Sequence, residues 1–149
     1  MNRHTYLRAY MAGVTVPAAV LLLVLTIFVI ARFVYNVPIP IERVIIFPMA
    51  LIPNVFGAWN ILYAALNGHR RWPIGLHGAI LPFLLAPTGY FFATHLHLIA
   101  ASENGVTYFV VAHVPYGLIA IVFPIGVAIY YLIWKYLVGF LNTLVGLPE

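Results

Sequence analysis

Four long apolar stretches, separated by short breaks, make up almost the whole 149-residue chain. Each is about as long as, or longer than, the roughly 20 apolar residues that cross the hydrocarbon core of a bilayer. They predict four helices, over residues 12–34, 41–66, 74–102 and 106–134. The third stretch stands out, because Ile74 to Ala101 has no Asp, Glu, Lys or Arg and yet contains three of the chain's six histidines.

The breaks between the stretches contain residues that end helices. Pro38 and Pro40 enforce an extended link between the first two helices. Asn67 and Gly68 are typical of a helix C-terminus. Pro17 is expected in the first turns of the first helix, where a missing N–H costs least. The sequence therefore places the helix ends at well-defined breaks.

The residues after the fourth helix predict a short amphipathic helix over 135–146. Apolar side chains recur along it at helical spacing, which suits a helix lying in the membrane interface. This apolar stripe comprises Leu137, Phe140, Leu141, Leu144 and Val145.

Composition explains why these helices belong in a membrane. Hydrophobic residues make up 64% and charged residues 7% of the chain, against about 25% charged in a soluble domain. We therefore expect one all-α transmembrane domain over 1–149, with four helices in an up-down antiparallel bundle. The absence of Cys excludes disulfides and thiolate metal sites. No basic stripe with interleaved aromatics suggests nucleic-acid binding.

Intramembrane histidines are the first candidate site. A tight turn over residues 102–105 would make the third and fourth helices antiparallel neighbours, and His95 and His113 are each nine residues from Asn104. Both rings would then lie at one depth, on the order of 10 Å from the midplane. Such a pair could bind a haem iron or a divalent metal, or relay protons. Alternatively, each neutral ring hydrogen-bonds a neighbouring helix.

Other polar side chains of the second and third helices extend this candidate site. Asn60 and Asn67 share one face of the second helix, and His77 begins the third helix at a comparable depth. Asn54 and Thr88 are expected near the midplane. These side chains could form a polar path, or they could form interhelical hydrogen bonds worth about 0.6 kcal/mol each.

A basic loop suggests a separate contact with lipid. Arg70 and Arg71, followed by Trp72, are expected at the membrane surface, where they could hold an anionic lipid headgroup. A loop on the cytoplasmic side is also expected to be basic for reasons of topology alone. Both interpretations stay open.

Catalytic groups are missing from the pattern. No carboxylate lies in the interior of a predicted span, since Glu42 stands at the very start of the second one, and neither HExxH nor GxSxG occurs. The sequence therefore favours a non-enzymatic integral membrane protein, acting as an oligomeric transporter or channel or as a subunit of a larger membrane complex. Its expected partners are the lipid bilayer and copies of itself or other membrane subunits. The alternative is an electron-transfer protein that binds haem or a metal through His95 and His113.

The basic residues predict the orientation of the chain in a membrane of the bacterial inner-membrane type. Five of the seven Lys and Arg residues fall on one side of the predicted spans, and Arg32 and Arg43 fall on the other. Because cytoplasmic loops carry the excess of Lys and Arg, both termini should face the cytoplasm. The five are Arg3, Arg8, Arg70, Arg71 and Lys135.

A reporter fused after Glu149 tests this orientation. A reporter that is active only in the cytoplasm should be active there, and one that is active only in the periplasm should be silent. Activity of the periplasmic reporter alone would contradict the predicted orientation.

Overall fold

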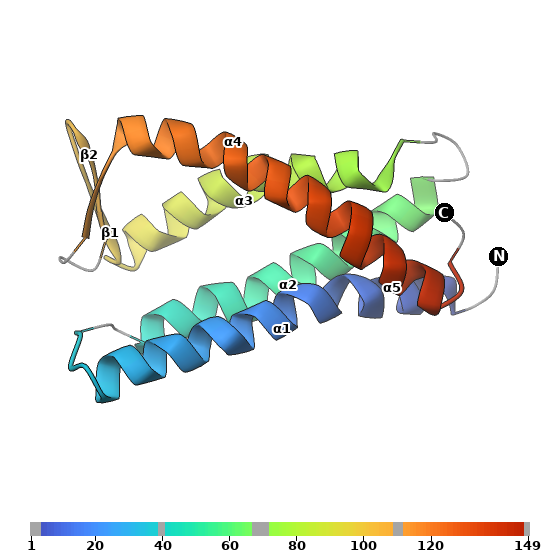
Figure 1. The fold of residues 1–149 in the computed structure, drawn as a ribbon, viewed down its shortest axis with the longest axis horizontal. Helices are drawn as coiled ribbons and strands as arrows, with labels where there is room; N and C mark the ends of the chain where they lie inside the picture. Colours follow the sequence, from blue (N-terminus) through green and yellow to red (C-terminus); the bar gives the residue numbers. More distant parts are fainter. Residues whose placement is uncertain (1–3, 39–40, 67–71, 109–111, 148–149) are drawn as a thin grey trace.

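A computed structural model describes residues 4–38, 41–66, 72–108 and 112–147, and for residues 41–50 it describes the backbone alone. The chain forms two helical hairpins (Figure 1). The first hairpin consists of α1 (Thr5–Phe33) and α2 (Ile41–Leu66). The second consists of α3 (Ile74–His95) and a long helix that runs from Tyr116 to Leu144. A small sheet joins the two helices of the second hairpin.

The prediction of a mostly helical chain is confirmed. Among the described residues, three helices are long and apolar enough to cross a membrane: Thr5–Phe33, Ile74–His95 and Tyr116–Leu144. The part of α2 whose side chains are described, Leu51–Leu66, is a shorter apolar helix. The bounds of α2 agree with the predicted 41–66. Helix α1 begins earlier than predicted, at Thr5, so that Pro17 lies inside the helix rather than in its first turns.

The connection between the third and fourth helices differs from the prediction. Residues 96–115 were expected to be helical apart from a four-residue turn, but three segments among the described residues of this range form an antiparallel sheet in the order β1-β2-β3. Ser102 pairs with Gly105, and Thr107 pairs with His113. The strands are β1 (Ile99–Ser102), β2 (Gly105–Tyr108) and β3 (Ala112–Pro115).

The end of α3 explains this difference. His97 adopts a left-handed conformation with φ of 55°. Its N–H donates to the Thr94 carbonyl at 3.1 Å, and the Leu98 N–H donates to the Ala93 carbonyl at 2.8 Å. This pair of bonds is the Schellman motif, which is usually built on glycine. Histidine takes this conformation less often than glycine does but more often than most residues.

The sheet fixes where the surface of the membrane lies. Strands β1 and β3 are edge strands, and an open sheet edge does not occur in the hydrocarbon region because its N–H and C=O groups would lack partners. The sheet therefore lies at the headgroup level or beyond. Helix α3, with 22 residues, is then roughly 33 Å long at 1.5 Å per residue, which matches a core of about 30 Å.

The opposite end of the bundle carries both ends of the chain. The Arg8 Nη1 atom donates to the carbonyl oxygen of Val145 at 3.4 Å, and Figure 1 shows the start of α1 beside α5. We call this end the termini end and the opposite one the sheet end. The start of α1 and the end of α5 therefore lie on the same side of the bundle.

The hydrophobic core lies toward the termini end. Its buried centre is a cluster contributed by α2, α3 and the long fourth helix, and partly buried side chains of α1 such as Val16 pack against it. Toward the sheet end the hairpins separate (Figure 1), and the apolar side chains there are largely exposed. The buried cluster comprises Phe56, Leu81, Trp134 and Val138.

The long fourth helix contains a π-helical segment and has no separate interfacial tail. It consists of α4 (Tyr116–Leu132), η1 (Ile133–Val138) and α5 (Gly139–Leu144). The predicted amphipathic helix over 135–146 is thus the end of the fourth span. Leu137, Phe140 and Leu144 of the predicted apolar stripe are exposed, whereas Val138 and Asn142 on the other side of this helix are buried.

Small residues set the closest helix contacts. A Cβ atom on Gly13 of α1 would lie 2.6 Å from the Phe56 carbonyl oxygen and 2.9 Å from the Gly57 Cα atom. A Cβ atom on Gly78 of α3 would collide with Trp134. Glycine is thus required at both crossings, as is common where membrane helices approach closely.

Replacing Gly13 by Ala should destabilise the first hairpin. The added methyl group meets backbone atoms that cannot rotate away, so the expected loss is about 1–3 kcal/mol of unfolding free energy. Gly126→Ala is the matched control, because a Cβ atom there meets nothing within 4 Å. Unfolding by denaturing detergent measures both variants. Equal stability of the two variants would contradict the close crossing of α1 and α2.

Candidate functional site

An apolar cavity lies between α3, α4 and the sheet. It has a volume of about 610 Å³, within the roughly 300–1,000 Å³ typical of ligand pockets. No charged side chain lines it. Helix α3 contributes one wall, α4 the other, and the sheet closes one end. The lining residues are Phe83, Leu85, Ala86, Pro87, Gly89, Tyr90, Ala93, Ile99, Val106, Tyr108, Tyr116, Ile119 and Phe123.

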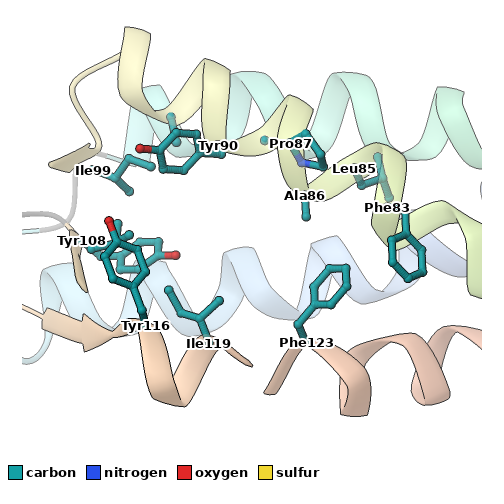
Figure 2. Close-up of a pocket in the computed structure, with 13 residues that line it drawn as sticks. Phe83, Leu85, Ala86, Pro87, Tyr90, Ile99, Tyr108, Tyr116, Ile119 and Phe123 are labelled. Atoms are coloured by element: carbon teal, nitrogen blue, oxygen red, sulfur yellow. The ribbon is translucent and has the colours of Figure 1, made fainter. Parts of the chain in front are cut away.

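The two ends of the cavity differ in polarity (Figure 2). Three tyrosines, Tyr90, Tyr108 and Tyr116, lie at the sheet end. The Tyr116 hydroxyl donates to the Ser102 carbonyl at 3.1 Å and so ties α4 to β1. At the other end, the rings of Phe83 and Phe123 meet edge to face, with centroids 5.2 Å apart. The cavity thus has a hydroxyl-bearing mouth and an aromatic floor.

The predicted pairing of His95 and His113 on adjoining helices is wrong. His113 lies on β3, where its Nδ1 atom is 3.2 Å from the Thr107 hydroxyl. His95 is the last residue of α3 and stacks on Phe91, with ring centroids 6.3 Å apart. Both rings are exposed at the sheet end of the bundle, so neither is buried between two helices as the prediction required.

The positions of His95 and His113 therefore do not support a shared metal or haem site. The two histidines have different partners and different backbone settings, and both are exposed. Within the described ranges, no three His, Asp or Glu side chains come together in a group that could hold a metal ion.

Thr88 bonds within its own helix, whereas Asn54 bonds to the neighbouring helix. The Thr88 hydroxyl donates to the Leu84 carbonyl of its own helix at 2.6 Å, next to the cavity-lining Pro87 and Gly89. Asn54 is exposed on α2 and accepts a hydrogen bond from the Tyr10 hydroxyl of α1. Neither contact connects the two residues to a shared polar path.

Asn60 forms a buried amide pair that the sequence did not predict in full. Its Nδ2 atom donates to the Ala9 carbonyl and to Asn142 Oδ1, each at 2.7 Å. Asn142 donates back to Asn60 Oδ1 at 3.1 Å. The pair joins α1, α2 and α5 at the termini end. This arrangement supports the packing interpretation of Asn60, since its amide is occupied by protein groups.

His77 lies at the same level of the bundle, as predicted. Trp59 of α2 donates its Nε1–H to the His77 carbonyl at 2.9 Å, and the Tyr63 ring meets the His77 ring edge to face at 5.1 Å. The side chain is 6% exposed, and its Nδ1 atom has no hydrogen-bond partner among the described residues. His77 is thus a buried ring between α2 and α3, enclosed by aromatic groups.

The predicted headgroup contact falls largely outside the described residues. Arg70 and Arg71 lie there, and so does Asn67 of the predicted polar face. Trp72 is described: it is exposed, and its ring centroid lies 6.2 Å from that of His77. Lipid binding by this loop stays a prediction.

Sequence reasoning missed two groups that define the sites. Asn142 was assigned to an interfacial tail, although a lone amide in an apolar segment is itself a signal of an interhelical hydrogen bond. The tyrosines of the cavity mouth were missed because the sheet that gathers them was not predicted. The signal for the sheet was present in Asn104-Gly105 followed by Val106, Thr107 and Tyr108, a turn with β-favouring residues after it.

Comparison with known proteins found no matching family model, no matching curated protein and no matching solved structure. The function therefore has to be inferred from the fold and the sites themselves.

The amide pair predicts a non-additive response to substitution. Asn60→Leu or Asn142→Leu alone leaves a buried amide without its partner and should cost about 1–3 kcal/mol of unfolding free energy. The double variant should cost less than the sum, because two apolar groups of similar shape replace the pair.

Unfolding of the four proteins by denaturing detergent gives the coupling energy. Thr26→Val is the control, since its exposed hydroxyl donates to the Leu22 carbonyl within α1, and it should be close to neutral. Additive losses would show that the two amides act independently.

Proposed function

We propose that the protein is a non-enzymatic integral membrane protein that works in an assembly. It acts either as an oligomeric transporter or channel or as a subunit of a larger membrane complex. The main support is the uneven packing of the two hairpins. Their shared core lies toward the termini end, whereas the halves of α1 and α4 near the sheet end present apolar side chains outward.

The extent of this outward apolar surface supports assembly with other helices. Leu23 and Ile27 of α1 are 68% and 62% exposed, and Ile121 of α4 is 64% exposed. Lipid satisfies such a surface, and so does the apolar face of another transmembrane helix. Because the two hairpins separate toward the sheet end, partner helices have room to pack against both hairpins there.

The positions of the polar groups also support several copies rather than one. The buried polar side chains of the described residues are Asn60, His77 and Asn142, and all three lie toward the termini end. Toward the sheet end, the cavity is apolar. Within the described part of one chain, no series of polar groups continues from one membrane surface to the other. An aqueous path would therefore need groups from several chains.

The chain's orientation is part of this proposal. Both termini would face the cytoplasm, and the sheet would face the opposite side. The bond from Arg8 to Val145 supports a shared side for the two ends, and the distribution of Lys and Arg supports the choice of side.

Assembly should be visible in the mass and the cross-links of the purified protein. In mild detergent the particle should contain more than one chain of 16.6 kDa, or it should contain partner subunits. Single chains at every concentration, with no co-purifying protein, would contradict the proposal.

The absence of native cysteine makes cross-linking specific. Leu23→Cys or Ile121→Cys should give cross-links between chains or to a partner in the native membrane. Leu81→Cys is the matched control, because Leu81 is fully buried in the core and should give none.

A further inference from the structure

The cavity between α3, α4 and the sheet differs from the outward apolar surface of the helices, because it lies between two helices and is closed at both ends, although one side is open. Phe83 and Phe123 meet at its floor, and β1 and β2 contribute Ile99 and Tyr108 at its mouth. The floor and the mouth together define the depth of the cavity, and the two helices define its width.

We propose that this cavity binds one acyl chain of a bilayer phospholipid, with the ester carbonyl of that chain at Tyr90 and Tyr108. The assignment extends the proposed function, because it names a ligand for one chain whatever the number of chains in the assembly.

The position of the cavity selects an acyl chain over water. Its walls are two helices that can cross a membrane, and its lining has no charged group and few polar atoms. A water molecule needs two to four polar partners to occupy a buried space. The cavity is also half-open to its surroundings, which at this depth are hydrocarbon. The molecule at highest concentration there is a lipid.

The shape of the cavity selects a chain over a helix. A helix with its side chains is about 10–12 Å wide, whereas this space lies between two helices that contact each other at the Phe83–Phe123 floor and are joined through the sheet. A second copy or a partner could cover the opening but could not insert a helix into it. An acyl chain, which is one methylene wide, can enter.

The tyrosines indicate which end of the acyl chain lies at the mouth of the cavity. The sheet places the mouth at the headgroup level, where tyrosine is common because its hydroxyl reaches polar groups while its ring stays in apolar surroundings. Tyr90 and Tyr108 are 48% and 36% exposed, so their side chains are accessible to a ligand from outside the protein. Ester carbonyl oxygens accept hydrogen bonds and lie at this level of a bilayer.

The depth of the floor fits the upper half of one chain. Phe83 and Tyr90 are seven residues apart on α3, which is roughly 10 Å at 1.5 Å per residue. One leaflet of the hydrocarbon core is about 15 Å thick. The middle carbons of the chain should therefore lie beside Phe83 and Phe123.

Photo-cross-linking in vesicles tests the proposal with the full chain. The probe is a phosphatidylcholine with a diazirine either beside the ester carbonyl or at the middle of one acyl chain. The first probe should label Tyr90, Tyr108 and their neighbours, and the second should label the region of Phe83 and Phe123. Peptide mass mapping locates the adducts.

Variants separate a bound chain from general contact with lipid. Ala86→Phe fills the cavity and should reduce both sets of adducts several-fold. Ala128→Phe is the matched control, because Ala128 is an exposed α4 residue outside the lining, and it should leave the adducts unchanged. Ala93→Phe fills the same space nearer its mouth and replaces Ala86→Phe if that variant does not fold.

The hydroxyl contribution is measured separately. Tyr90→Phe with Tyr108→Phe should keep the cavity but weaken binding of the ester lipid roughly tenfold, the effect of losing two hydrogen bonds of ordinary strength. An ether-linked phosphatidylcholine, which lacks the ester carbonyl, should bind equally to the wild type and to this variant.

Three outcomes would overturn the proposal. Adducts spread evenly over the outward faces of α1 and α4, and unchanged by Ala86→Phe, would show ordinary contact with lipid. Cross-links from cavity residues to another protein chain would show that protein occupies the space. Reversed positions for the two probes would exclude the assigned direction. None of these outcomes changes the particle mass, so the proposed assembly is tested independently.

Discussion

The contact between Trp134 and Gly78 is the constraint on which the rest of the structure depends. The missing side chain of Gly78 lets the indole lie against the backbone of α3, and the other side of the indole meets Phe56 of α2 with centroids 5.7 Å apart. One fully buried ring thereby joins the two hairpins. The nearby Asn60–Asn142 pair holds the same level, so the hairpins are fixed at one end and can diverge at the other.

The sequence predicted the helical class and the bounds of α2 because apolar periodicity and proline breaks are local signals. It did not predict the sheet, because the apolar residues of this region are as compatible with a membrane helix as with a strand. The choice depends on His97, whose left-handed conformation ends α3. No local rule requires that conformation of a histidine, although the hydrogen bonds to the Thr94 and Ala93 carbonyls stabilise it once it forms.

The candidate sites were predictable to the extent that they depend on depth along a helix. Asn60 and His77 were placed at one level correctly, because both helix starts were known. The His95–His113 hypothesis depended on the same arithmetic, but it assumed a helix where β3 lies. The cavity could not be predicted at all, since its mouth is formed by Tyr90, Tyr108 and Tyr116 from three different elements.

The π-helical segment η1 has a consequence for how this sequence can vary. Each residue added to a helix turns the following residues by about 100°, and a π turn absorbs one such addition. One half of the fourth helix lines the cavity, and the other half carries Trp134 and Asn142. The direction in which one half points its side chains therefore need not fix the direction for the other half. Insertions or deletions of single residues near Ile133–Val138 could alter one half's orientation toward lipid while the other half keeps its partners.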